Sequence, residues 1–273
     1  MICFPNAKIN LGLNVVEKRN DGFHNLETIF YPIGWHDTLE ITESKDLEEP
    51  FKLSLSGIKI AGAKEDNLLY KAYELIKKQK NLPSINVHLQ KNIPMGAGLG
   101  GGSADAAFFI NLLDNRFSLN LSEETRIDIA KQLGSDCAFF INNKPVFASE
   151  KGDVFSELNL DLSPYYIAVI FPDVHSNTKD AYSLIKPQFP QRPVLEVIRQ
   201  PIETWKDYLI NDFETSIFKK YPEVQKVKQD LYDCGALYAS MSGSGSAVYG
   251  LFKENPMIKH LDHFPHWVGK MMS

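Results

Sequence analysis

The sequence predicts an α+β fold in two lobes, and three observations support this. Strand-like and helix-like segments are mixed along the chain without strict β-α alternation. The chain has 273 residues, which is long for one hydrophobic core, because single cores stop growing near about 250–300 residues. A run of glycines stands directly before an apolar helical stretch. We place the boundary between residues 150 and 165, which gives lobes 1–155 and 156–273.

The first strand is predicted from alternation over residues 8–15. One face of this segment is apolar and the other is mostly polar: Ile9, Leu11, Leu13 and Val15 against Lys8, Asn10, Gly12 and Asn14. The pattern is typical of a strand with one buried face. A turn is signalled by Asn20-Asp21-Gly22. Later strands are expected at residues 27–33, 37–43, 51–55 and 85–89, within 144–171, and at 237–241 and 247–252.

Helices are predicted from apolar residues that recur at helical spacing. In the first of them Leu68, Ala72 and Ile76 lie on one stripe. Another starts after Ser122, an N-cap residue type, and stops at Gly134. The expected helices cover residues 67–78, 103–114, 122–133, 178–185 and 222–234.

The composition is that of an ordinary globular protein, with 44% apolar and 23% charged residues. The net charge is −5, so no excess of Lys and Arg is available to neutralise a nucleic-acid backbone, and nucleic acid is not an expected partner. Apolar runs such as 165–171 are far shorter than the roughly 20 residues of a membrane helix. The N-terminus has no apolar signal stretch, so no membrane association is expected.

The three cysteines are scattered along the chain and form no C-x-x-C pair. This usage fits a reducing cytoplasm, without disulfides and without a thiolate metal site. Histidines recur at positions 260, 263 and 266, but Pro265 interrupts their spacing and no cysteine is near. We therefore predict no protein metal site there.

Five glycines fall between residues 96 and 102, directly before a predicted helix. Glycine permits positive φ and lets a ligand approach the backbone closely. The helix start adds unpaired N–H groups and a positive dipole end, so the segment predicts a phosphate site. The structural alternative is a tight strand-to-helix turn, which one or two glycines would satisfy.

Three common phosphate-loop types do not fit this segment. No lysine follows the glycines, as a Walker A loop requires. Gly96, Gly98 and Gly101 match G-x-G-x-x-G, but residues 119–124 start a helix where a dinucleotide fold needs an acidic strand end. The H-R-D and D-F-G motifs of protein kinases are absent.

Three motifs in order resemble those of the GHMP kinases. The loop from Pro94 to Ser103 reads P-M-G-A-G-L-G-G-G-S, like the phosphate loop of that family. Pro5 to Leu13, P-N-A-K-I-N-L-G-L, is similar to its first motif, and Met241 to Ala247, M-S-G-S-G-S-A, to its third. The resemblance implies a two-lobe α+β kinase that uses ATP and Mg²⁺, with ATP and substrate between the lobes.

Two further segments resemble one branch of that family. They are Arg19 to His24, R-N-D-G-F-H, and Leu133 to Phe140, L-G-S-D-C-A-F-F. The branch implies phosphorylation of the 2-hydroxyl of a cytidine-diphosphate-linked small molecule in non-mevalonate isoprenoid-precursor synthesis. Residues 1–155 would then form the nucleotide-binding lobe and 156–273 the substrate-side lobe.

The resemblance also implies which residues bind ATP. Asn67 and Leu68 match an N-L pair near the adenine, and Lys91 matches a position at the adenine end of the nucleotide. Their structural alternatives are a helix N-cap for Asn67 and a strand-end lysine for Lys91. The loop residues expected to bind ATP are Pro94, Met95, Gly96, Ala97, Gly98, Leu99, Gly100, Gly101, Gly102, Ser103 and Ala104.

Asp136 is the candidate general base. Phosphoryl transfer needs an acceptor hydroxyl that is aligned and relieved of its proton. The structural alternative is an N-cap of the next segment; the matching family position is the catalytic aspartate. Lys8 alone would be read as a solvated strand lysine, but its place in the first motif implies a partner for Asp136. A nearby lysine lowers the pKa of a carboxyl group and keeps it ionised.

The remaining site residues are assigned to the acceptor substrate. Asn10 shares a strand face with Lys8 and is expected to hold substrate hydroxyls. The family implies that Phe23 stacks on the cytosine, that His24 reads its edge, and that Tyr182 is the second aromatic. Packing and surface positions are the alternatives for these rings. Further substrate contacts are expected from Thr178, Gly243 and Ser244, although the last two also suit a plain hairpin turn.

Two other functions stay open from the sequence. One is another GHMP-type kinase acting on a mevalonate-like or homoserine-like substrate, which free cytidine nucleotides would not inhibit. The other is a nucleotide-sensing binding protein that has lost phosphoryl transfer. The presence of Lys8 and Asp136 argues against this second alternative. The sequence leaves monomer and homodimer both open.

Overall fold

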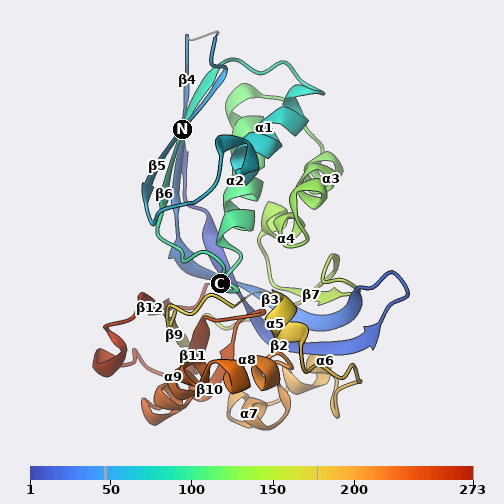
Figure 1. Cartoon of the computed structure of the whole chain (residues 1–273), viewed down its shortest axis with the longest axis vertical. Coiled ribbons are helices and arrows are strands. Elements are labelled where there is room, and N and C mark those ends of the chain that lie inside the picture. Colours follow the sequence, from blue (N-terminus) through green and yellow to red (C-terminus); the bar gives the residue numbers. More distant parts are fainter. Residues whose placement is uncertain (46–47, 177, 273) are drawn as a thin grey trace. The chain divides into compact units, whose positions relative to one another are not determined.

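The computed structural model describes residues 1–45, 48–176 and 178–272, and the chain forms two compact units (Figure 1). The first unit holds Met1–Ala7, Trp35–Met95 and Gly100–Lys144; the second holds Lys8–Gly34, Gly96–Leu99 and Pro145–Ser273. This division differs from the contiguous lobes 1–155 and 156–273 that the sequence predicts. Residues 8–34 belong with later segments because the main chain of Leu13 hydrogen-bonds to Ile210 and Asp212. In the same unit, β3 (His24–His36) pairs with β7 (Val146–Ser149).

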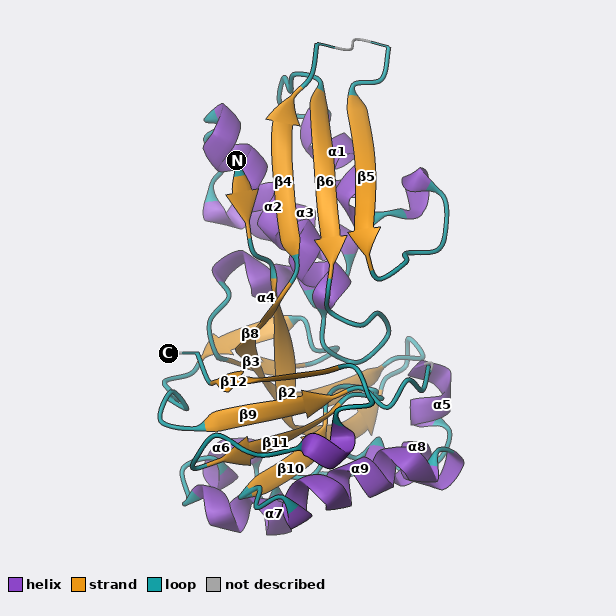
Figure 2. Cartoon of the chain, turned by 90° about the vertical axis from the view of Figure 1, so that its left-hand side faces the viewer, coloured by secondary structure: helices purple, strands orange, loops and turns teal. Residues whose placement is uncertain are grey.

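The first unit is a four-stranded sheet covered by helices on one face, as Figures 1 and 2 show. Its strands, in the order β1-β4-β6-β5, are Ile2–Cys3, Thr38–Glu43, Ile85–Lys91 and Phe51–Gly57. Neighbours are antiparallel except for β5 and β6, which are parallel. The covering helices are α1 (Leu68–Lys77), α2 (Gly101–Phe117), α3 (Glu123–Leu133) and α4 (Cys137–Asn142).

Local sequence explains where these helices begin. The side chain of Asn67 accepts a hydrogen bond from the N–H of Leu69 and caps α1, and Ser122 caps α3 in the same way through Thr125. Helix α2 begins at Gly101, two residues before the predicted start, with Gly100 in the left-handed region as its N-cap. The start of α2 therefore lies inside the glycine run.

The second unit contains two four-stranded sheets. One has the order β2-β3-β7-β8, in which β2 is Asn6–Lys18 and β8 is Val154–Glu157. The other has the order β10-β11-β9-β12, with strands Tyr238–Met241, Val248–Phe252, Tyr166–Ile170 and His266–Lys270, all antiparallel. The helices are α5 (Thr178–Tyr182), α6 (Val194–Val197), α7 (Trp205–Tyr208), α8 (Glu214–Lys220) and α9 (Pro222–Asp233).

Helices α8 and α9 close the core of the second unit, with α9 packed along β10 and β11 (Figure 2). Ile217 and Leu231 from these helices pack with Leu13 of β2 and Val248 of β11, all of them buried. Removing such side chains from water supplies the main stabilisation of the unit. The same packing holds β2 together with β10 and β11, the strands on either side of the β10–β11 loop.

The α+β prediction is confirmed, but the prediction for the first strand is wrong in one respect. Both faces of β2 are buried, since Lys8, Asn10 and Asn14 are as covered as the apolar residues between them. Burial of polar groups is tolerated when they are hydrogen-bonded, and Asn10 donates to Thr28. Helix α5 ends three residues early, where the Ser183 hydroxyl donates to the Asp180 carbonyl.

Candidate active site

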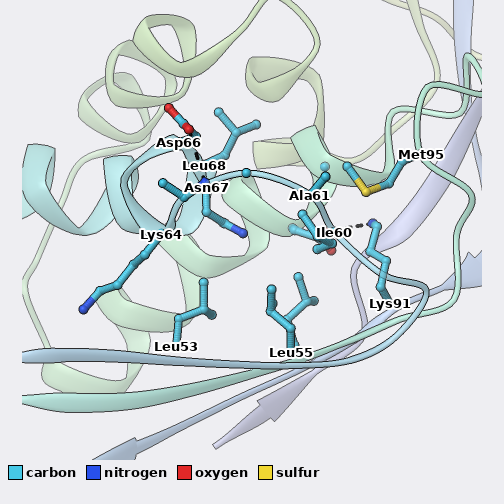
Figure 3. Close-up of a pocket in the computed structure, with 15 residues that line it drawn as sticks. Leu53, Leu55, Ile60, Ala61, Lys64, Asp66, Asn67, Leu68, Lys91 and Met95 are labelled. Atoms are coloured by element: carbon cyan, nitrogen blue, oxygen red, sulfur yellow. Dashed lines mark hydrogen bonds and ion pairs between the residues drawn. The ribbon is translucent and has the colours of Figure 1, made fainter.

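A pocket of about 310 Å³ in the first unit is lined mainly by apolar side chains (Figure 3). Leu53 and Leu55 of β5 form one wall, and Asn67 and Leu68 at the start of α1 form another. Its size and apolar lining are typical of small-molecule sites. The residues predicted to bind nucleotide that line it are Asn67, Leu68, Lys91, Met95 and Gly102.

Lys91 lies at the pocket wall between two buried carboxylates. Its Nζ atom contacts a carboxylate oxygen of Asp37 and lies 2.9 Å from Oδ2 of Asp105. Asp37 is held further by the N–H of Ile93, at 2.9 Å. Burial raises the pKa of Asp105 to about 7, Lys91 opposes this rise, and Asp37 adds to it. The strand-end lysine is therefore part of a buried charge cluster.

The glycine-rich loop has the alternating backbone of an anion-binding nest. Gly96, Gly98 and Gly100 have φ values of 66°, 77° and 71°, and each is separated from the next by one residue. Such alternation turns successive N–H groups toward one side, where an anion can lie. The loop then runs into the N-terminus of α2, which adds the positive end of the helix dipole.

In the second unit, Gly98 lies against the β10–β11 loop. The Ser242 hydroxyl donates to the Gly98 carbonyl at 2.8 Å, and the N–H of Ala247 donates to the Ala97 carbonyl at 3.0 Å. A Cβ atom on Gly98 would lie 2.0 Å from the Ser242 carbonyl oxygen. The first and third predicted motifs meet here as well, because the Asn10 N–H donates to the Ser242 hydroxyl.

Lys8 is only 3% exposed, and its ammonium group is held by polar partners. Nζ donates to Oδ1 of Asn10 at 2.6 Å and to the Gly98 carbonyl at 3.2 Å. It also lies 4.8 Å from the centre of the Phe30 ring, a cation–π distance. The alternative of a solvated lysine is therefore wrong: the structure brings together Lys8, Asn10 and Gly98 of the glycine-rich loop.

Asp136 stands at the N-cap position of α4, but its side chain makes no capping hydrogen bond. Its Oδ1 accepts a hydrogen bond from the Ser135 hydroxyl at 3.3 Å. The residue is partly exposed. The Asp136 side chain therefore does not serve as an N-cap, which was its structural alternative. The assignment of Asp136 as the general base stays a prediction.

The residues predicted to read cytosine all belong to the second unit. His24 and Tyr182 stack on each other, with ring centres 4.6 Å apart and planes 25° apart. Phe23 is 60% exposed, and Nζ of Lys151 lies 5.4 Å from its ring centre. Burial lowers the pKa of His24, and Lys18 lowers it further, so its neutral ring offers one donor and one acceptor.

The other predicted substrate residues are placed as follows. Thr178 is the first residue of α5, and Tyr182 is the last. Gly243 and Ser244 lie in the β10–β11 loop, where the Ser244 carbonyl accepts a hydrogen bond from the Ser176 hydroxyl at 2.8 Å. The contacts of these residues with a substrate stay predictions.

Comparison with known proteins decides the family. The family models for the GHMP kinases N terminal domain and the GHMP kinases C terminal match residues 67–144 and 196–259. A 4-diphosphocytidyl-2-C-methyl-D-erythritol kinase from Bacteroides fragilis is 52% identical over 262 residues, 96% of each chain. The chain belongs to the family of these kinases. The sequence-based prediction of a GHMP kinase is confirmed.

Solved structures agree with this membership. A crystal structure of 4-(cytidine 5'-diphospho)-2C-methyl-D-erythritol kinase matches with a TM-score of 0.84 and 29% identity, and the match covers all of both chains. The mevalonate kinase of Methanococcus jannaschii matches with a TM-score of 0.70 over 100% of this chain and 98% of its own, at 13% identity. The second likeness concerns the fold alone. As a member of this kinase family, the chain is a phosphotransferase.

Several polar residues around these kinase motifs were missed by sequence reasoning. Asp37 lies between β3 and β4 and belongs to no motif. Its neighbours in the sequence do not indicate that it is buried. Lys151 follows Glu150 in a turn and is far from Phe23 in the sequence, and the fold brings its Nζ atom near the Phe23 ring. Asn211 and Glu214 lie outside all three motifs, yet both bond to residues at the β10–β11 loop.

Within the described residues, no three His, Cys, Asp or Glu side chains are grouped so that they could hold a metal ion. None of the helices in the described ranges is long and apolar enough to cross a bilayer.

Replacing Asp105 with asparagine is expected to flatten the pH dependence of stability between about pH 4 and pH 7. The pKa of this carboxyl is 3.8 in an ordinary setting and about 7 in the fold. The folded state therefore holds the proton more tightly, and this contribution to stability is present below about pH 4 and lost as pH rises to about 7. Urea unfolding at several pH values measures the effect; parallel curves for variant and wild type would contradict it.

Proposed function

We propose that this kinase transfers the γ-phosphate of ATP to the 2-hydroxyl of 4-diphosphocytidyl-2-C-methyl-D-erythritol, giving the 2-phosphate and ADP. The observation that carries the proposal is the 52% identity, over 96% of the chain, to a kinase named for that substrate. The stacked rings of His24 and Tyr182, with Phe23 next to His24 in the sequence, support it, because aromatic and imidazole groups suit a pyrimidine ring.

The proposed chemistry is in-line transfer, in which positioning and electrostatics do most of the work. Asp136 accepts the proton of the attacking hydroxyl as its oxygen bonds to the γ-phosphorus. Lys8 places a positive charge by the acceptor oxygen, and Asn10 orients the hydroxyls. The nest at Gly96 to Gly100 and the start of α2 hold the phosphate oxygens, since both offer N–H groups.

ATP is proposed to place its adenine in the pocket lined by Leu53, Asn67 and Leu68. That pocket offers apolar walls for the flat ring, with Met95 and the Lys91 cluster at its edge. Magnesium is proposed to arrive with ATP, held mainly by phosphate oxygens and water, as is common for this ion. Its role is to neutralise charge that develops on the transferred group.

Replacing Phe23 with alanine is expected to raise KM for the cytidine substrate about 5- to 150-fold, since stacking of a base on an aromatic ring contributes roughly 1–3 kcal/mol. KM for ATP should change little. Steady-state kinetics with each substrate varied in turn measures this. Phe189→Ala is the matched control, because Phe189 is also exposed, at 74%. Equal effects of the two variants would argue against cytosine stacking on Phe23.

The function itself is tested by ADP release with MgATP and three acceptors in parallel. These are 4-diphosphocytidyl-2-C-methyl-D-erythritol, mevalonate and homoserine, with free cytidine nucleotides as competitors. Turnover of the first alone, inhibited by cytidine nucleotides, is the expected result. Turnover of another acceptor would keep the chemistry and reject the substrate, whereas ATP binding without any turnover would favour a nucleotide sensor.

We also propose that the enzyme works in the cytoplasm. Its three cysteines, Cys3, Cys137 and Cys234, are free thiols in the structure, which suits a reducing compartment.

A further inference from the structure

Asn211 is a buried polar residue outside every motif, and it holds the β10–β11 loop directly. It is only 1% exposed. Its Nδ2 group donates to the carbonyl of Met241 at 2.8 Å and to that of Gly243 at 2.9 Å. Its Oδ1 accepts the N–H of Phe213 at 3.0 Å. One side chain thus fixes two carbonyls, one at the start of the loop and one within it.

These three partners require an amide at this position. Both loop carbonyls can only accept a hydrogen bond, and the Phe213 N–H can only donate. A carboxylate of the same shape could keep the bond to Phe213, but it would set a negative oxygen against two carbonyl oxygens. The position is therefore one where asparagine and aspartate, which are nearly equal in size, have opposite effects.

The backbone around Asn211 binds the strand that carries Lys8 and Asn10. The N–H of Leu13 donates to the Ile210 carbonyl at 2.9 Å, and the N–H of Asp212 donates to the Leu13 carbonyl at 2.8 Å. Residues 210–212 are thus docked on β2 through the main chain. The side chain of Asn211 reaches from this docked segment to the loop.

The loop in turn supports the phosphate-binding segment. Ser242 stands between the two carbonyls that Asn211 holds, and its hydroxyl donates to the Gly98 carbonyl, which also accepts from Nζ of Lys8. Glu214 fixes the strand that leads into the loop, because its Oε1 accepts the Met241 N–H at 2.9 Å and its Oε2 accepts from Lys228 at 2.7 Å. A shift of the loop would therefore move the surroundings of both Gly98 and Lys8.

We propose that Asn211 is a positioning residue for phosphoryl transfer: it holds Ser242 and Gly243 so that Gly98 and Lys8 keep their places. The role rests on the proposed function, since it concerns the same phosphate and acceptor sites. In this role Asn211 contacts neither ATP nor the acceptor; it acts through the loop.

The test compares Asn211→Asp with Tyr238→Phe in the full-length protein. Tyr238 is a matched control, because its buried hydroxyl donates to the Leu209 carbonyl at 2.8 Å, in the segment next to Asn211, without bonding to residues 242–246. For Asn211→Asp we expect kcat to fall about 100-fold, the size expected for a small misplacement of reacting groups, with a much smaller change in either KM. Tyr238→Phe should lose stability and keep kcat.

Hydrogen exchange of peptides that contain residues 242–246 provides a readout that needs no turnover. The loop should exchange faster in Asn211→Asp and not in Tyr238→Phe. If the wild type fails to phosphorylate the cytidine substrate, the proposed function is wrong. Hydrogen exchange of the loop would then still test whether Asn211 holds the loop. Unchanged loop exchange, or a loss of kcat equal to that of the control, would overturn the positioning role.

Asn211→Ser, which keeps a donor in a smaller side chain, serves if the aspartate variant does not fold. The loop of Asn211→Ser should exchange faster than that of the wild type. Where Asn211→Asp also folds, Asn211→Ser should retain more activity than the aspartate variant. If neither variant folds while Tyr238→Phe does, Asn211 serves folding of the second unit and the positioning role is wrong.

Discussion

Replacing Asp136 with asparagine is expected to lower kcat by about 10²–10⁴-fold, the range that general acid–base groups contribute, with ATP affinity nearly unchanged. The amide keeps the size of the carboxyl group but cannot take the proton of the acceptor hydroxyl. At the helix start, the Asp136 side chain makes no capping hydrogen bond to α4 that the substitution would remove. Loss of activity should therefore come without a large loss of stability.

Single-turnover kinetics with saturating ATP and cytidine substrate measures the chemical step directly. Asp128→Asn is the control, since Asp128 is an exposed carboxylate on the neighbouring helix α3. If Asp136→Asn kept a rate near that of the wild type, Asp136 would not be the base. Combination with Lys8→Met adds a second test, because residues that act on one step give losses that are not additive.

Much of the fold was predictable because long periodic segments dominate it. The alternation at residues 8–15 predicts β2, and Ser122 and Gly134 bound α3 as their residue types indicate. Short elements such as α4 and α6 were missed, because four to six residues contain too little periodicity to identify a helix. The observed division of the chain differs from the predicted one too, since Leu13 hydrogen-bonds to Ile210 and Asp212, which lie far beyond it in the sequence.

The candidate site was predictable where a motif fixes backbone shape. The glycines at 96, 98 and 100 have positive φ values, a conformation that the residue type itself indicates. Burial of Lys8 was not predictable, because its alternating strand pattern has the appearance of a solvated face. Only the partners that the fold brings in from Gly98 and Asn10 explain it. Motifs thus identify the candidate residues, while distant segments determine the environment of those residues.

Replacing Gly98 with alanine is expected to damage both stability and activity. The residue has a φ of 77°, a conformation that costs side-chain-bearing residues roughly 1–2 kcal/mol. The added Cβ would also lie 2.0 Å from the Ser242 carbonyl oxygen, and overpacking typically costs a further 1–3 kcal/mol. We expect the free energy of unfolding to fall by about 2–5 kcal/mol, the sum of these two costs.

The matched control, Gly235→Ala, separates backbone strain from the contact between the loops. Gly235 has a φ of 92° at the end of α9, but nothing lies within 4 Å of the position of its Cβ. This variant should lose only the conformational part of the stability, measured by urea unfolding, and keep ATP affinity and kcat. Gly98→Ala should lose ATP affinity and kcat as well as stability, because the clash separates the glycine-rich loop from Ser242. If the two variants behaved alike, close packing of the loops would not be what phosphate binding requires.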